Sequence, residues 1–195
     1  MAKPNVISKG DLIKSAKACL VDKGIEKFTL RAVAEAAGVT QGTVYYHFKT
    51  KEQLLLDIVQ DVCESSWSEI SRQNHPYITS QALASAESRC SYDSFFHKLF
   101  FTVAASSLHN EKIRSQLGEV LSTENHALTA NLANLWSHSP IEGVSLETWG
   151  FFFNAMVDGL ALQALLQKDF PVEKTYKEMA QLFQGLSDLI NKEDE

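Results

Sequence analysis

Residues 28–54 of the chain read FTLRAVAEAAGVTQGTVYYHFKTKEQL, and the order of features in this stretch decides the fold of the N-terminal end. Thr29 suits the N-cap of a helix over residues 30–37, because its hydroxyl can accept a hydrogen bond from a free amide of the first turn. Gly38 follows, where a tight turn requires a positive φ. Another threonine then caps a second short helix over residues 40–47. Two short helices joined by a glycine-containing turn predict a helix-turn-helix unit.

Further helices are predicted on both sides of this unit. Upstream, apolar residues recur at intervals of three and four and form one stripe, which holds Leu12, Ile13, Ala16, Cys19 and Leu20. Gly24 suits the end of that helix. Downstream, Thr50 caps a fourth helix with an apolar side that holds Leu54, Leu55, Ile58, Val59 and Val62. We therefore expect a three-helix DNA-binding domain over residues 1–51.

The second helix of such a unit lies in the major groove and presents its N-terminal residues to base edges. Gln41 can pair with adenine, and Thr40 and Thr43 can bond a base edge or touch a thymine methyl group. Gly42 would allow close approach, while Val44 and Phe48 face inward. The side chains left as phosphate donors are Tyr45, Tyr46, His47, Lys49 and Lys51. Because aromatic rings also serve in cores, we expect at least one of the two tyrosines to be partly buried.

The stretch from Leu12 to Leu56 resembles the DNA-binding signature of the tetracycline-repressor (TetR) family, most densely between Gly38 and Lys51. The resemblance implies an all-helical, dimeric regulator that usually represses and is often released from DNA by a ligand. It implies phosphate contacts at Thr29, Thr40, Tyr45, Tyr46, His47 and Lys51, and base contacts at Gln41, Gly42 and Thr43. Many relatives carry a basic or small residue in place of Gln41, which bears on the operator sequence and not on the docking mode.

Charge is distributed unevenly along the chain. Residues 1–51 hold nine Lys and Arg against four acids, a surplus of five, which leaves −11 for the rest of a chain whose net charge is −6. This asymmetry favours a basic module that attracts phosphates, joined to an acidic body. The three cysteines include no CxxC pair, so neither a disulfide framework nor a zinc site is expected. No secretory signal is recognised, and a cytoplasmic protein is predicted.

Residues 52–195 are expected to form a helical regulatory and dimerisation domain, which gives an all-α protein of about nine helices. A long helix is predicted over residues 113–136, and residues 146–166 are apolar nearly all round. A membrane span would have a suitable length, but Asn154, Asp158 and Gln163 inside it disfavour that alternative. We instead expect this helix and the last one to form a four-helix interface with a second subunit. The predicted dimer interface contains Val157, Leu160, Ala161, Ala164, Leu165, Met179 and Phe183.

A ligand cavity is a further hypothesis, which rests on the supply of aromatic residues and on the resemblance. It would lie between the fourth helix and the helices that follow, and it would bind a small apolar or amphipathic effector. The candidate lining residues are Trp67, Phe100, Asn125, Phe153, Asn154 and Met156, with the two asparagines as polar anchors.

Two other classes of function, an enzyme and a protein-interaction module, are less consistent with the sequence than a regulator. An enzyme is disfavoured because the chain has no GxSxG, HExxH, P-loop or GxGxxG motif in suitable surroundings. The six histidines lack metal-ligand spacing, so no metal or cofactor is expected. A protein-interaction module that has lost DNA binding is disfavoured by the intact set Gln41, Tyr45, His47 and Lys51. The predicted function is that of a homodimeric repressor, released from a palindromic site on double-stranded DNA by a small molecule.

Overall fold

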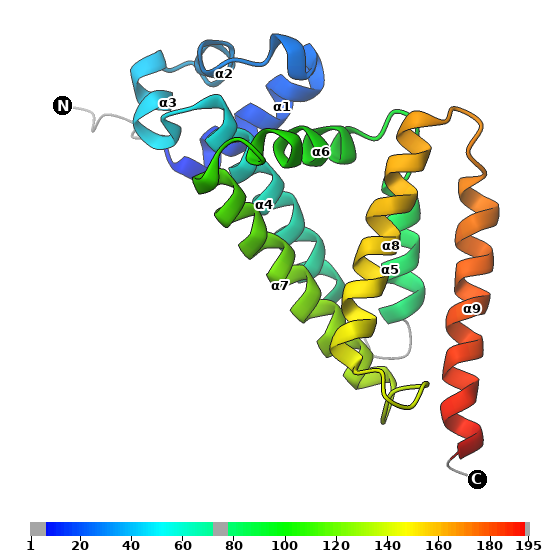
Figure 1. Cartoon of the computed structure of the whole chain (residues 1–195). Coiled ribbons are helices and arrows are strands. Elements are labelled where there is room, and N and C mark those ends of the chain that lie inside the picture. The colour runs from blue at the N-terminus through cyan, green and yellow to red at the C-terminus, as the bar shows by residue number, and fades with distance from the viewer. Residues whose placement is uncertain (1–6, 72–77, 194–195) are drawn as a thin grey trace. The chain divides into compact units, whose positions relative to one another are not determined.

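The computed structural model describes residues 7–71 and 78–193, and these ranges are helical apart from short connections (Figure 1). The predicted all-α fold is confirmed, and nine helices lie in the described ranges. In chain order they are α1 (Lys9–Lys27), α2 (Leu30–Ala37), α3 (Gln41–Phe48), α4 (Lys51–Ser71), α5 (Ile78–Arg89), α6 (Phe95–Ser107), α7 (Glu111–Leu135), α8 (Leu146–Leu166) and α9 (Val172–Glu193).

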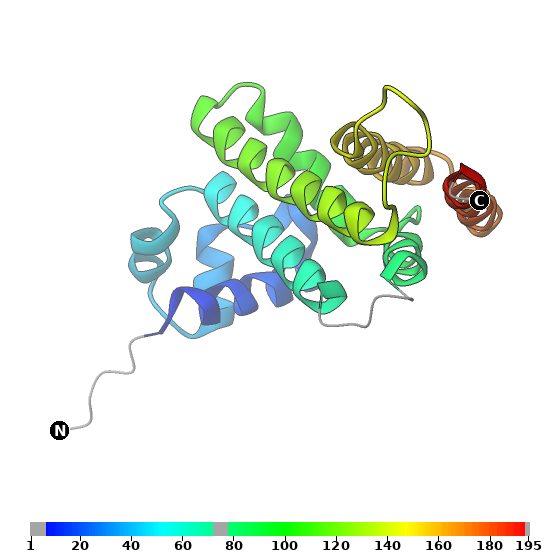
Figure 2. The same ribbon diagram turned by 90° about the horizontal axis from the view of Figure 1, so that it is seen from below.

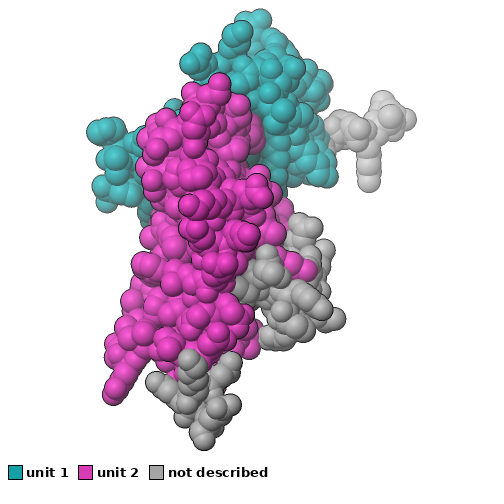
Figure 3. All heavy atoms as spheres, turned by 90° about the vertical axis from the view of Figure 1, so that its right-hand side faces the viewer, with its two compact units in different colours: residues 1–62, 99–117 teal, residues 63–98, 118–195 magenta. Residues whose placement is uncertain are grey.

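The chain divides into two compact units, which Figure 3 shows in different colours. Unit 1 holds residues 1–62 and 99–117, and unit 2 holds residues 63–98 and 118–195. The sequence interpretation instead drew a boundary after residue 51, at the start of α4. The first half of α4 belongs to unit 1, where its apolar side is buried.

The turns of the helix-turn-helix region follow local capping chemistry. Thr29 Oγ1 accepts a hydrogen bond of 3.0 Å from the amide of Ala32 at the start of α2. Gly38 ends α2 in the left-handed region at φ 66° and ψ 30°. Thr40 caps α3 by accepting from the amide of Thr43 at 3.3 Å. Gly24, at φ 71°, interrupts α1 as predicted, although helical turns resume after it and continue to Lys27.

Unit 1 has a core in which nine apolar side chains are fully buried. They come from all four of its first helices and from the connection after α1: Leu12, Ala16, Phe28, Val33, Val44 and Phe48 show no exposed surface, and Leu54, Ile58 and Val59 of α4 show none either. Burial of one large apolar side chain contributes about 1.5–3 kcal/mol, so this core accounts for the stability of a region made of short helices.

Unit 2 is organised around the antiparallel pair α8 and α9, which run side by side in Figures 1 and 2. One core cluster joins these two helices to the end of α5 and includes Ala86, Cys90, Ala161, Ala164, Tyr176 and Met179. A second cluster joins them to the end of α7 and includes Leu132, Trp136, Phe153 and Ile190. Trp136 is stacked on Phe183 of α9 with ring centroids 5.1 Å apart, and its indole N–H donates to Ser187 Oγ at 2.9 Å.

Close packing between α7 and α8 depends on Gly150. A Cβ at this position would lie 2.5 Å from Thr129 Oγ1 and 3.2 Å from the backbone oxygen of Asn125. Any larger residue would therefore push the two helices apart.

Helix α8 alone, among the residues that the structure describes, is long and apolar enough to cross a membrane by length and composition. The core helix of a soluble protein can have the same length and composition. Of the residues in its most apolar stretch, 22% are buried within the chain, so much of its apolar surface has no cover in a single copy.

Candidate nucleic-acid interface

Helix α3 has one buried and one exposed side. Val44 and Phe48 are fully buried and hold the helix against the core of unit 1. Gln41 and Gly42 are exposed, and Thr43 is half-buried on the first turn. The residues expected to face bases therefore lie together at the exposed N-terminal end of α3, a short helix held in place by two buried side chains.

The expectation that one of the two tyrosines is partly buried is wrong. Tyr45 is 55% exposed and Tyr46 is 72% exposed. Val44 and Phe48 are four residues apart and already fill the inner side of the helix, so both tyrosine rings are left outside. The two phenol hydroxyls are thus available to an external partner.

The capping threonines keep hydrogen-bond capacity for a ligand. Thr29 Oγ1 accepts from a backbone amide, which leaves its hydroxyl proton free to be donated elsewhere. Thr40 Oγ1 lies 3.0 Å from Thr43 Oγ1, and either hydroxyl can be the donor of that bond. His47 is half-buried, and its ring meets the ring of Tyr46 edge-on at 5.3 Å.

Lys51 is held inward. Its ammonium donates to the backbone oxygen of Ile25 at 2.9 Å and lies 6.0 Å from the centre of the Phe28 ring. This bond satisfies a carbonyl near the end of α1 and fixes the first residue of α4 to it. Lys49 differs, because its ammonium lies over the exposed rings of Tyr45 and Tyr46, at 5.4 Å and 5.2 Å.

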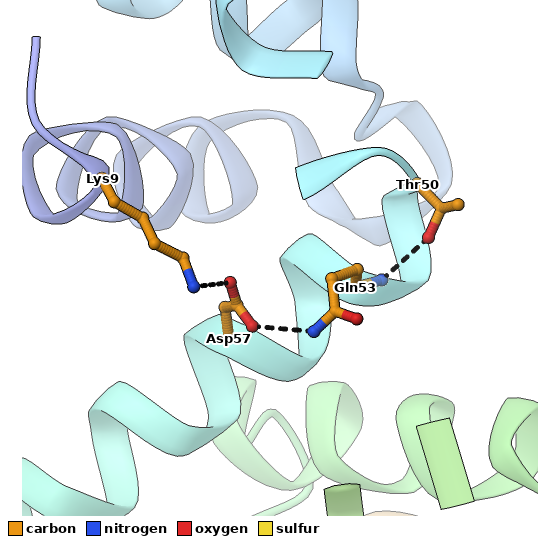
Figure 4. Close-up of polar contacts among 4 residues, drawn as sticks. All are labelled: Lys9, Thr50, Gln53 and Asp57. Carbon is orange, nitrogen blue, oxygen red and sulfur yellow. Dashed lines mark hydrogen bonds and ion pairs between the residues drawn. The ribbon is translucent and has the colours of Figure 1, made fainter. Parts of the chain in front are cut away.

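A buried carboxylate joins α4 to α1, and Figure 4 shows its contacts. Asp57 Oδ2 forms a 2.6 Å ion pair with Lys9 Nζ, while Oδ1 accepts from Gln53 Nε2 at 3.0 Å. The side chain of Asp57 is 8% exposed, against 53% for Lys9. Lys9 also lies 5.8 Å from the centre of the Phe48 ring, at the end of α3. The contacts of Lys9 with Asp57 and Phe48 form a joint that links α1, α3 and α4.

A second ion pair joins the same two helices through Lys17 and Asp61. Sequence reasoning missed both pairs. The available signal was Asp57 itself, an isolated acid inside the apolar run Leu54–Val59. A buried charge is expensive unless it is paired, so such an acid indicates a nearby cation.

These pairs reduce the charge asymmetry inferred from the sequence. Residues 1–62 hold nine basic and seven acidic residues, a surplus of two where residues 1–51 suggested five. Lys9 and Lys17 neutralise acids within unit 1. The net positive charge available to DNA phosphates is therefore small and local. Each remaining exposed cation then contributes a larger share of the attraction to phosphates.

The predicted ligand-binding residues are only partly brought together. Asn154 Nδ2 donates to Asn125 Oδ1 at 2.8 Å in unit 2. Phe153 is buried in the second core cluster of that unit, and Met156 packs against both clusters. Phe100 is buried in unit 1. Trp67 lies on α4, but its side chain falls outside the described residues.

Unit 2 also contains a cluster of ionisable groups that the sequence did not indicate. Burial raises the pKa of Asp158 to about 7, Glu124 adds to the rise, and Arg89 opposes it. Burial likewise raises the pKa of the Cys63 thiol, with a further rise from its hydrogen bond and charge interaction with Glu124. Arg89 donates to Ser66 Oγ at 3.3 Å. Four helices thus contribute one cation, two carboxyl groups and a thiol.

The predicted dimer-interface residues divide into two groups. Ala161, Ala164 and Met179 are buried in the core of their own unit and have no surface left for a partner. Half-buried positions are Val157, Leu160, Leu165 and Phe183. Large exposed apolar side chains instead occupy other positions of α8 and α9, namely Phe151, Phe152, Leu162, Leu166, Leu182 and Leu189.

Neither a metal site nor a disulfide is found where the structure is described. No group of three His, Cys, Asp or Glu side chains there could hold a metal ion. Cys19, Cys63 and Cys90 are all buried as free thiols.

With this geometry in view, residues 12–58 match the model of the "Bacterial regulatory proteins, tetR family". This segment is a DNA-binding region of the TetR family. The matched residues extend from α1 to the first half of α4, which is the segment that holds the capped helices and one member of each Lys–Asp pair, Lys17 and Asp57. The family consists of regulators of transcription and not enzymes, in agreement with the interpretation of the sequence.

Relatives of the chain support the same conclusion. The repressor KstR2 of Mycolicibacterium smegmatis is 34% identical over 53 residues, which is 27% of this chain and 26% of that protein. The match therefore spans about a quarter of the relative's length. A TetR regulator from Haloarcula marismortui has the same fold with a TM-score of 0.71 at 14% identity, covering 93% of this chain and 96% of the other. The structure of the multidrug binding protein EbrR, solved with proflavin, has a TM-score of 0.60 at 19% identity. The match covers 89% of this chain and 98% of EbrR.

Proposed function

We propose that this chain is a homodimeric, sequence-specific DNA-binding regulator that represses transcription and is released by a small apolar or amphipathic ligand. One observation carries the DNA-binding part: α3 is capped at its start and fully buried at Val44 and Phe48, which leaves Gln41 and Gly42 exposed beside the half-buried Thr43. A recognition helix needs an inner side that is fixed by packing and an N-terminal end that is polar and accessible to base edges.

Sequence readout would rest on Gln41 and Thr43, with Gly42 allowing the helix backbone to approach the bases. Gln pairs with adenine through two hydrogen bonds, and such a pair contributes about 1–3 kcal/mol of discrimination. Positioning on the phosphates would come from the hydroxyls of Thr29, Thr40, Tyr45 and Tyr46 and from the His47 ring. Lys51 was expected in this set, but because its ammonium donates inward we propose that it acts by fixing the start of α4.

Dimer formation is supported by an uncovered apolar stripe on α8. Phe151, Ala155, Leu162 and Leu166 are exposed and fall on one face when placed at 100° per residue. On α9, exposed Leu182 and Leu189 are one heptad apart. Two such helices from each subunit would form a four-helix interface, and the two recognition helices of the dimer would then read a palindrome.

The ligand-release part of the proposal rests on two observations. EbrR, which shares the fold, was solved with a bound small molecule. In this chain α4 contributes residues up to Val62 to unit 1 and residues from Cys63 to unit 2. A ligand bound in unit 2 beside Asn125 and Asn154 that prefers one placement of α4 would change DNA affinity by the same free energy of coupling.

Selection of bound fragments from a bacterial genomic library tests the DNA-binding function. We expect one palindromic sequence to be enriched, and Gln41→Ala to bind it about 5- to 150-fold more weakly than the unchanged protein. Gln163→Ala, an exposed change on α8, is the matched control and should bind as the unchanged protein does. Failure to enrich any sequence would argue for a protein-interaction module in place of a regulator.

Sedimentation of two charged variants of α8 tests the dimer. Leu162→Glu places a charge in the middle of the exposed apolar stripe and is expected to shift the protein to monomers. Gln163→Glu adds the same charge one residue further on and outside the stripe, and it should leave dimers intact. Monomers in the unchanged protein at micromolar concentration would contradict the dimer.

A screen of small molecules on the bound palindrome tests ligand release. We expect some apolar or amphipathic compound to lower DNA affinity and to bind the protein in the absence of DNA. Variants of Asn125 or Asn154 should weaken that response while leaving DNA affinity unchanged in the absence of the compound. A response that persists in both variants would place the ligand elsewhere.

A further inference from the structure

The connection between the recognition helix α3 and α4 consists of Lys49 and Thr50, and the backbone of Lys49 is strained. Lys49 has φ 64° and ψ −47°, and it is the one described residue other than glycine with a positive φ. The amide of Thr50 donates to the backbone oxygen of Phe48 across it at 2.7 Å. This is a γ-turn of the rare kind with positive φ at its centre, a conformation that is strained for any side chain.

Glycine would make the same turn without that strain, because it has no Cβ. The turn itself is fixed from both ends: the amide of Lys49 donates to the backbone oxygen of Tyr45, and Thr50 caps α4 by accepting from the amide of Gln53. The backbone therefore needs a sharp turn here, but nothing in the turn needs a lysine. A reason for the lysine has to come from its side chain.

The side chain places a cation on the exposed face of the recognition helix. The Lys49 ammonium lies 5.4 Å and 5.2 Å from the ring centres of Tyr45 and Tyr46, and both rings are mostly exposed. Such contacts at an exposed site are weak, so they orient the ammonium without consuming its donors. Three hydrogen-bond donors remain available to an anion beside two phenol hydroxyls.

Three other lysines, on α1 and at the start of α4, make their polar contacts within unit 1. Lys51 donates to the backbone oxygen of Ile25, Lys9 pairs with Asp57, and Lys17 pairs with Asp61. Lys49 thus differs from these three in the direction of its charge as well as in its backbone conformation.

We propose that Lys49 is the cation that binds the DNA phosphate backbone at the C-terminal end of the recognition helix, and that the strained turn is kept because it aims this ammonium along the tyrosine face. The proposal rests on the DNA-binding function proposed above. It assigns to Lys49 the phosphate contact that the family resemblance implies for Lys51. Phosphate contacts are independent of base sequence, so the role predicts an effect on affinity without an effect on specificity.

Three substitutions at position 49 separate charge from strain. Lys49→Gly removes both, Lys49→Ala removes the charge and keeps the strain, and Lys49→Arg keeps both. We expect Gly to raise the midpoint of thermal unfolding by about 2–4 °C, while Ala and Arg leave it near that of the unchanged protein. Stability and DNA affinity should therefore move in opposite directions in Lys49→Gly.

DNA affinity is measured against salt concentration on the selected palindrome and on a scrambled duplex. For Ala and Gly we expect a severalfold loss at 0.15 M salt on both duplexes, with the slope of log K against log salt smaller by about one per subunit. Lys49→Arg should retain the slope. Lys51→Gln serves as the comparison, with a lower unfolding midpoint and an unchanged slope.

Two results would overturn the proposal. One is an unchanged slope in Lys49→Ala and Lys49→Gly while the unchanged protein binds the palindrome, which removes the phosphate role of Lys49 alone. If affinity falls but the slope does not, Lys49 acts only by positioning the tyrosines, and the proposal is equally wrong. The other is a failure of the unchanged protein to prefer any duplex, which removes the proposed function together with this one.

Discussion

The two units of the chain are stabilised in different ways. In unit 1, short helices are set by local caps at Thr29, Gly38 and Thr40 and then tied together by Lys–Asp pairs. In unit 2, longer helices pack through aromatic side chains around Trp136 and enclose a charged cluster around Asp158. The difference teaches that a recognition element can be specified by short-range chemistry, whereas the body depends on contacts between residues far apart in sequence.

The largest effect is expected from removing the aromatic centre of unit 2. Trp136→Ala should destabilise the protein by roughly 3–5 kcal/mol, because the indole is 2% exposed and contacts rings from α8 and α9. Urea unfolding followed by circular dichroism measures the loss. Phe152→Ala, with a ring 51% exposed, is the matched control and should cost far less in a monomer. If both variants lost the same free energy of unfolding, the aromatic cluster would not be the main source of stability in unit 2.

The charged cluster of unit 2 should make stability depend on pH. The pKa of Asp158 is raised by burial and Glu124 to about 7, above its unfolded value of 3.8, so the folded state binds this proton more tightly than the unfolded state. The stabilising contribution is therefore full below about pH 4 and is lost as pH rises towards 7, by at most about 1.4 kcal/mol per pH unit.

Asp158→Asn isolates this contribution. We expect the variant to gain stability relative to the unchanged protein as pH rises from 5 to 8, in urea unfolding at each pH. Asp169→Asn, at an exposed position, should track the unchanged protein. A constant difference between Asp158→Asn and the unchanged protein across this range would rule out a titrating carboxyl at the cluster.

The ion pairs of unit 1 should differ in strength because their acids differ in burial. Lys9→Met leaves a carboxylate that is 8% exposed without its cation, at a cost of about 1–3 kcal/mol. Lys17→Met leaves Asp61, which is 43% exposed and can be hydrated, so the cost should stay below about 1 kcal/mol. Urea unfolding of both variants compares them directly. The reverse order would mean that burial of Asp57 does not govern the joint between α1 and α4.

The two glycines of α8 should respond in opposite directions to the same substitution. Gly150→Ala should destabilise by about 1–3 kcal/mol, because the new Cβ would meet Thr129 Oγ1 at 2.5 Å. Gly159→Ala should stabilise by about 0.5–1 kcal/mol, since nothing lies within 4 Å of its Cβ and alanine favours a helix. A loss in Gly159→Ala would indicate that the position is covered in the dimer, which sedimentation would then reveal.

Local signals made much of the fold predictable from the sequence. The threonine caps, Gly38 and the apolar spacings predicted the helix-turn-helix region, and the long apolar run predicted α8 with its observed bounds. The pairing of Lys9 with Asp57 was not predictable, because it joins residues 48 positions apart and no periodicity links them. The exposure of both tyrosines was missed for a different reason, since composition alone does not decide which aromatic residues a short helix can bury.

The body of the protein was predicted less well. Small residues on α8 were assigned to a partner subunit, but Ala161 and Ala164 pack within their own core, and the uncovered stripe holds larger side chains. The cluster around Arg89, Glu124 and Asp158 could not be predicted either, because its members come from three different helices. Such contacts arise only once the tertiary packing is known.

The ratio of dissociation constants for the selected palindrome and a scrambled duplex of the same composition, measured at 0.15 M salt, tests the central claim most directly. A recognition helix that presents Gln41, Gly42 and Thr43 to base edges predicts a preference of at least about 10³-fold for the palindrome, and Gln41→Ala should reduce that preference. A ratio near one in the unchanged protein would contradict the claim that α3 reads DNA sequence.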